Sequence, residues 1–214
     1  SGERPLFPHL FAPYFYSMEI FFASFFLAVA AAFIFAYLTF FLSPKWQKVV
    51  KFLAFIGESL PDVFIIIIVQ LAVVMIYLKT LLLVADTAGV WGNHVYFLPI
   101  LCLSLLPAFL FYRMVLLSCE EQMDMDYIEL AKSKGLTKQA LLIRHITRNI
   151  LVTVFFYSKS IIWLMLSNLL IVEYLFNITG ITQFMFDHRM PIIYITCMLM
   201  IFVPVFSFLH WRNG

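Results

Sequence analysis

The chain alternates between long apolar runs and short polar connectors. Apolar runs lie at about residues 15–42, 60–79, 95–117, 150–172 and 191–209. Each is about as long as a helix of roughly 20 residues, which crosses ~30 Å of hydrocarbon. A much longer polar stretch, residues 120–148, separates the third run from the fourth. The pattern predicts an all-α fold, a polytopic bundle of transmembrane helices in one domain with one large polar connector.

Two of these runs carry further detail. In "GESLPDVF", residues 57–64, Ser59 is a candidate N-cap with Pro61 and Asp62 in the next turn, so a new helix is expected to begin there after an interfacial stretch. In the first run a small residue recurs at every fourth position, at Ala28, Ala32 and Ala36. This spacing predicts a helix face for close packing.

Composition supports a membrane protein. The 214 residues are 64% hydrophobic and 12% charged, with a mean hydropathy of +0.97, whereas soluble domains have about 25% charged residues. The three cysteines and five histidines share no close spacing, so neither a disulfide framework nor a metal site is expected. A net charge of +2 is too small to indicate nucleic acid as a partner.

The basic residues predict the orientation. Ten of the 14 fall in the connector 43–51, the stretch 113–148 and the C-terminal tail, and three fall on the opposite side. Because cytoplasmic loops are rich in Lys and Arg, the polar stretch and the C-terminus are predicted to be cytoplasmic. Five crossings then place the N-terminus outside, and the chain starts "SGERPLF", so we expect that an N-terminal crossing is missing from this sequence.

The polar stretch predicts two short helices joined by a corner. Acidic residues open the first helix and lysines close it, which suits the helix dipole. Gly135 follows the last turn, where a left-handed residue is usual. Thr137 can cap the second helix, with Leu136 and Leu141 as a hydrophobic staple. An ordinary amphipathic loop on the membrane surface would explain the charges but not these caps.

This stretch resembles the signature loop of ATP-binding cassette transporter permeases, in which Glu-Ala-Ala is followed after three residues by Gly. Glu129-Leu130-Ala131 precedes Gly135 at that spacing. "DYIELAKSKGL" (126–136) and "LLIRHITRNI" (141–150) resemble the B-type subunit of oligopeptide and dipeptide importers. "VEYLFNITGI" (172–181) is similar to that branch's Val-Glu-x-x-Phe-x-x-Pro-Gly-Leu segment, with Thr179 at the usual Pro. The branch's C-terminal Asn-Leu, Val-Asp and Asp-Pro-Arg elements are absent, which indicates a divergent member.

The resemblance implies a type I importer permease in a bacterial cell membrane, with two cytoplasmic coupling helices seated on ATP-binding cassette subunits. It implies two such subunits, a second permease that completes the pathway, and an extracytoplasmic substrate-binding protein. ATP and Mg²⁺ would be bound by the partners, since the chain has no phosphate-binding Gly-Lys-Ser/Thr loop. The cargo is left open among a peptide, nickel and another small solute. The implied coupling residues are Asp126, Tyr127, Glu129, Ala131, Gly135, Leu136, Leu141, Arg144, His145 and Arg148.

Polar residues within the apolar runs are candidates for the solute pathway. Lys159 lies near mid-bilayer, where an ionisable group is costly unless it is paired or faces water. Glu58 and Gln70 are its candidate neighbours, and Asn168 is a further pathway candidate. A structural Lys–Glu pair or a lysine reaching toward the headgroups explains Lys159 equally well.

Three residues mark the connector after the fourth run, Glu173, Gly180 and Asp187. A substrate-binding protein would dock on this outer connector, although Glu173 and Asp187 are also explained as ordinary solvated charges.

Two other functions remain open. A membrane-embedded enzyme would need converging catalytic groups at membrane depth, and no such motif occurs, so the chain is predicted not to be an enzyme. A sensor or scaffold on a permease-like frame would share the loop without transporting a solute.

Overall fold

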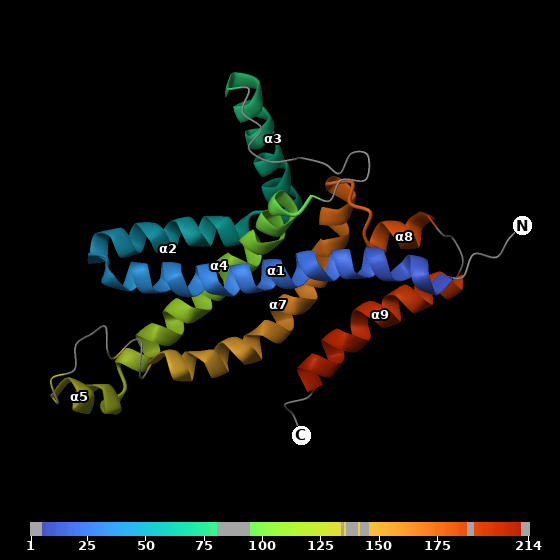
Figure 1. The fold of residues 1–214 in the computed structure, drawn as a ribbon. Helices are drawn as coiled ribbons and strands as arrows, with labels where there is room; N and C mark the ends of the chain where they lie inside the picture. The colour runs from blue at the N-terminus through green and yellow to red at the C-terminus, as the bar shows by residue number, and fades with distance from the viewer. Residues whose placement is uncertain are drawn as a thin grey trace, which may run out of the picture. The chain divides into compact units, whose positions relative to one another are not determined.

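The structure is a computed structural model that describes residues 6–80, 95–133, 135, 141, 146–187 and 191–210. These residues form helices and no strand, which confirms the all-α prediction (Figure 1). The helices are α1 (Leu6–Phe41), α2 (Pro44–Ser59), α3 (Asp62–Thr80), α4 (Phe97–Met123), α5 (Asp126–Ser133), α7 (Thr147–Leu175), α8 (Ile181–Asp187) and α9 (Pro191–His210).

In the described part of the chain, four helices are long and apolar enough to cross a membrane. They cover Leu10–Phe41, Asp62–Lys79, Phe97–Met123 and Thr147–Leu175. The apolar part of α9, Pro191–Val205, is shorter. Helices α1, α4 and α7 extend beyond the apolar runs read from the sequence: α1 begins earlier, α4 ends later and α7 is longer at both ends.

The start of α3 corrects one sequence prediction. Ser59 does not cap this helix: it is the last residue of α2, and its hydroxyl donates back to the Phe55 carbonyl at 2.7 Å. The Pro61 carbonyl instead accepts the first bonds of α3, from the amides of Phe64 and Ile65. A hydroxyl that bonds its own preceding turn is not free to cap the next helix.

The chain divides into two compact units, which are described separately. Unit 1 comprises Ser1–Ser24, Pro61–Leu103 and Met165–Gly214, and unit 2 comprises Phe25–Leu60 and Ser104–Leu164. Helices α1, α4 and α7 contribute residues to both units.

The core of unit 2 includes the small-residue face of α1. Ala28, Ala32 and Ala36 are at most 1% exposed, which confirms that this face is packed. Next to it, the rings of Phe25 on α1 and Phe111 on α4 meet edge to face with centroids 5.9 Å apart. Small side chains let helix backbones approach closely, so the alanines position α1 within this unit.

Polar contacts tie the helices of unit 2 at several levels. The hydroxyls of Tyr37 on α1 and Thr147 on α7 lie 2.5 Å apart. Lys51 on α2 pairs with Glu120 on α4 at 2.5 Å, with both side chains about two-fifths exposed. Exposed ion pairs contribute about 0–1 kcal/mol each, so apolar packing supplies most of the stability.

Unit 1 is organised around the first half of α1. Ile20 and Phe21 are at most 1% exposed. Before them, the Tyr16 hydroxyl donates to the Val95 carbonyl at 2.9 Å and accepts from the Val95 amide at 2.8 Å. This side chain therefore satisfies both backbone groups of a residue that precedes α4 and has no helical partner for them.

Candidate functional site

The first predicted coupling helix is α5, which follows the end of α4 after a two-residue turn (Figure 1). Asp126 and Glu129 lie in its first turn, where carboxylates are stabilised by the helix dipole. Ile128 is fully buried while Glu129 is exposed, so one face packs on the chain and the other is open. Gly135 follows with φ of +80°, the left-handed conformation expected after the helix end.

Three side chains clamp α5 to the helices on either side of it in the sequence. The Tyr127 hydroxyl on α5 donates to Gln122 Oε1 on α4 at 2.6 Å. The Asn149 amide on α7 donates to the same oxygen at 3.0 Å and contacts the Tyr127 hydroxyl at 3.4 Å. We call Gln122, Tyr127 and Asn149 the amide clamp. It joins α5 to both α4 and α7.

Sequence reasoning selected Tyr127 but missed Gln122 and Asn149. The two amides are 27 residues apart, and no local spacing rule pairs them. Each is also a common residue at a helix end. Only the return of the chain at α7 brings them together.

We expect Gln122→Met to loosen α5 without unfolding the chain. The methionine keeps the length of the side chain but cannot accept the bonds from Tyr127 and Asn149, at a cost of about 1–2 kcal/mol. Trypsin should then cleave after Lys132 or Lys134 several-fold faster, measured by limited digestion in detergent. Gln122→Glu, which keeps an acceptor oxygen, is the matched control, and equal cleavage rates for all three proteins would contradict the clamp.

The remaining coupling candidates divide into described and undescribed residues. Leu141 is buried at 1% exposure, together with Ile146 and Ile150 in unit 2, and Arg148 is exposed in the first turn of α7. The following lie outside the described residues: Leu136, Arg144, His145, most of the second coupling helix with its Thr137 cap, and the side chain of Ala131.

The four pathway candidates fall in different units and make different contacts. In unit 1, the Gln70 amide donates to the Leu175 carbonyl at 3.3 Å, and the Asn168 amide donates to Asp62. Glu58 and Lys159 belong to unit 2, Lys159 half-buried near the middle of α7.

Glu58, one of the two candidate neighbours of Lys159, pairs with a different residue. Glu58 accepts instead from Arg113 Nη1, at 2.9 Å through Oε1 and at 3.1 Å through Oε2. Arg113, which the sequence analysis counted with the polar connector, lies inside α4, ten residues before Met123. At 1.5 Å per residue this is about 15 Å from the helix end. An arginine within the apolar run 95–117 is the signal that could have identified Arg113 as a candidate.

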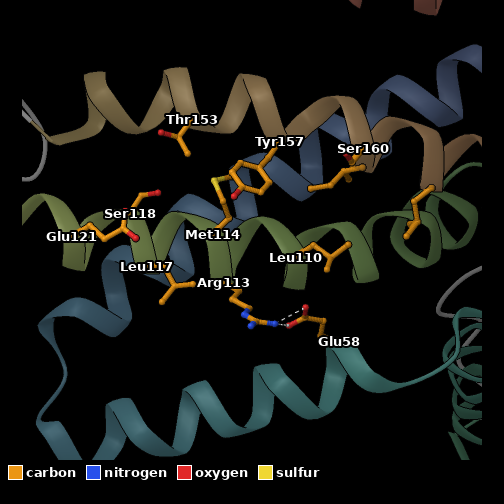
Figure 2. Close-up of a pocket in the computed structure, with 12 residues that line it drawn as sticks. Glu58, Leu110, Arg113, Met114, Leu117, Ser118, Glu121, Thr153, Tyr157 and Ser160 are labelled. Atoms are coloured by element: carbon orange, nitrogen blue, oxygen red, sulfur yellow. Dashed lines mark hydrogen bonds and ion pairs between the residues drawn. The ribbon is translucent and has the colours of Figure 1, made fainter.

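The Glu58–Arg113 pair lines a cavity of about 480 Å³ in unit 2. Figure 2 shows the cavity lying over α4, with the charged pair on one side and side chains of α7 on the other. Leu110, Met114 and Leu117 of α4 form its apolar floor. The hydroxyl side chains that line it are Ser118, Thr153, Tyr157 and Ser160.

Glu173, predicted to be a solvated or docking charge, is neither. It lies in the last turns of α7 with 1% exposure. Its Oε1 accepts from the Ser17 hydroxyl at 2.5 Å, and Oε2 accepts from the Thr182 amide at 2.9 Å and the Thr182 hydroxyl. We call this arrangement the carboxylate knot. It ties α1, α7 and α8 within unit 1.

The other two outer residues differ from each other. Gly180 packs directly against the knot, since a Cβ there would lie 2.3 Å from the Glu173 carboxyl carbon. Asp187, at the end of α8, is exposed and remains available to a partner.

The sequence matches one protein family over most of its length. Residues 25–210 match the binding-protein-dependent transport system inner membrane component. The chain belongs to this family. The match includes the C-terminal part of α1, α2 to α5, all of α7 and both C-terminal helices, and it confirms the family resemblance drawn from the signature loop.

The chain is similar to two permeases whose names state what they transport. The metal-staphylopine import system permease protein CntB of Staphylococcus aureus is 27% identical over 164 residues, which cover 73% of this chain and 50% of that protein. The dipeptide transport system permease protein DppB of Bacillus subtilis is 29% identical over 133 residues, or 62% of this chain and 41% of that protein. The chain spans about half the length of the curated relatives it matches.

Proposed function

We propose that the chain is the permease subunit of an ATP-binding cassette importer and forms half of its solute pathway. Two ATP-binding cassette subunits, a second permease and an extracytoplasmic binding protein would complete the machine. Family membership and the relation to two import permeases support this assignment. In this proposal the chain performs no catalysis and binds no cofactor; ATP and Mg²⁺ are handled by the partner subunits.

The observation that carries the proposal is the construction of α5. Glu129 is exposed for contact, Ile128 is buried, and the amide clamp ties the helix to α4 and α7. An amphipathic loop lying on lipid would need neither the clamp nor the left-handed Gly135. A lever that converts closure of the ATPase subunits into movement of the spans needs both, because a compliant joint would absorb the movement.

The basic residues support a cytoplasmic position for α5 in a bacterial cell membrane. With Arg113 assigned to α4, nine basic residues remain on the side of the polar stretch and three on the other. Because the positive-inside bias depends on connectors near the spans, this asymmetry supports a coupling loop on the inner side of the membrane. The exposed Asp187 would then face the binding protein.

We propose a short peptide as the solute. The resemblance to peptide permeases and the relation to a dipeptide permease favour it. A metal chelate is the second candidate, since the match to the metal-staphylopine permease covers more of the chain. Uptake of a labelled dipeptide and of a metal–staphylopine complex by cells that express the full-length protein separates the two.

Charge reversal on α5 tests the coupling role. The complex is purified through a tag on the full-length chain, and the ATP-binding subunit that co-purifies is quantified. Glu129→Lys is expected to lower this subunit at least about tenfold, a loss of roughly 1.4 kcal/mol in binding. Asp187→Lys, an equally exposed carboxylate on α8, is the matched control and should retain the subunit. Full retention by Glu129→Lys would instead favour the sensor or scaffold function.

A further inference from the structure

The cavity over α4 has the features of a ligand site rather than of a lipid contact. An arginine remains charged in proteins, and a charged or hydroxyl-rich surface inside a spanning segment is unfavourable against hydrocarbon. The cavity contains both Arg113 and four hydroxyl side chains, carried by two helices of spanning length, α4 and α7. Such a surface is expected to face water or polar solute. Its volume of about 480 Å³ lies in the range of small-molecule sites, about 300–1,000 Å³.

Three charged side chains line the cavity, Glu58, Arg113 and Glu121, and the first two pair with each other. Arg113 Nη1 is held between the two oxygens of Glu58 at 2.9 and 3.1 Å. The Glu58 side chain is 20% exposed, whereas that of Arg113 is 59% exposed and therefore has room to turn. A solute that brings one ammonium and one carboxylate can replace this pair without leaving either charge unpaired. A solute with a single charge leaves one of the two residues uncompensated.

We propose that this cavity binds a short peptide with free ends, and that Glu58 takes the ammonium group while Arg113 takes the carboxylate. The hydroxyls of Thr153 and Ser160 lie across the cavity from the charged pair (Figure 2). Hydroxyls both donate and accept, so they suit a peptide bond of any sequence. The apolar floor of α4 contacts the side chains without selecting among them. The assignment rests on the proposed transport function and names the residues that would bind the charged ends of the solute.

Three related probes separate the two charge contacts. Alanyl-alanine carries both charges, N-acetyl-alanyl-alanine lacks the ammonium, and alanyl-alanine amide lacks the carboxylate. Dissociation constants are measured by calorimetry on the purified complex of the full-length chain with its second permease and ATPase subunits, without the binding protein. Wild type should bind alanyl-alanine at least tenfold more tightly than either blocked probe.

Two variants assign the charges to residues. Glu58→Gln should weaken the binding of alanyl-alanine and of the amide about tenfold. It should leave the binding of the acetylated probe unchanged. Arg113→Gln should weaken the binding of alanyl-alanine and of the acetylated probe about tenfold. It should leave the binding of the amide unchanged. Both variants break the same α2–α4 ion pair, so a purely structural role would affect all three probes alike. Lys51→Gln breaks the other α2–α4 pair, Lys51–Glu120, outside the cavity and should change none of them.

The following results would overturn the inference. One is an equal loss of affinity for all three probes in both variants. Another is a phospholipid that stays bound to Arg113 and that alanyl-alanine does not displace. A wild-type complex that binds none of the probes also refutes it. The permease assignment is decided separately, by retention of the ATPase subunit in Glu129→Lys, so failure here is distinguishable from failure of the proposed function.

Discussion

Replacing Gly135 by valine is expected to reduce solute uptake at least about tenfold while the chain still inserts into the membrane. Gly135 has φ of +80°, and an L-residue in that region costs roughly 1–2 kcal/mol, more when it is β-branched. About 1.4 kcal/mol corresponds to a factor of ten in the population of the native corner. The corner sets the direction in which the chain leaves α5, so its loss should uncouple ATP hydrolysis from transport. Uptake and ATPase activity are measured in reconstituted vesicles.

The matched control is Gly135→Asn. No atom of the described residues lies within 4 Å of a Cβ built at this position, so their packing does not oppose a larger side chain. Asparagine tolerates the left-handed region and should retain most of the uptake. Equal uptake by the valine and asparagine variants would show that backbone conformation at the corner is irrelevant to coupling.

Replacing Glu173 by leucine is expected to destabilise unit 1 more than any other single carboxylate change in the described chain. The substitution leaves the Ser17 hydroxyl, the Thr182 amide and the Thr182 hydroxyl without their acceptor in a buried site. Each buried group left without a partner costs about 1–3 kcal/mol, so the total should be about 3 kcal/mol or more. Thermal denaturation of the wild type and the variant in detergent measures the loss of stability.

Two further variants define the cause. Asp187→Leu removes an exposed carboxylate from the same unit and should have little effect. Gly180→Ala keeps Glu173 but places a Cβ 2.3 Å from its carboxyl carbon, so it should destabilise through displacement of the knot. If Glu173→Leu unfolds at the wild-type temperature, the knot does not contribute to stability.

Local chemistry was readable from the sequence. The acidic start of α5, the left-handed Gly135 after its end and the packed alanine face of α1 all depend on neighbours within a few residues. Ser59 is the exception, because its predicted role as the N-cap of α3 was wrong. Two local hydrogen bonds competed for its hydroxyl, and the sequence does not indicate that the bond to Phe55 is made.

The sequence did not predict which groups pair with Glu58 and Glu173. Glu58 was one of two candidate neighbours of Lys159, and its partner proved to be Arg113; Glu173 was expected to be a docking or solvent-facing charge and proved to be buried. Arg113 lies 55 positions from Glu58, and Ser17 lies 156 positions from Glu173; the other donor to Glu173, Thr182, is nine positions away but on the next helix. The role of the coupling residues in ATP-driven transport stays a prediction.

Hydrophobic runs, basic connectors and the spaced signature loop were enough to establish that this is a helical membrane protein of a transport family. These properties follow from transfer of side chains into lipid and from contacts between residues three to seven apart. The amide clamp, the carboxylate knot and the charged cavity arise only when distant helices pack together, because each depends on hydrogen bonds between groups that the chain order leaves far apart.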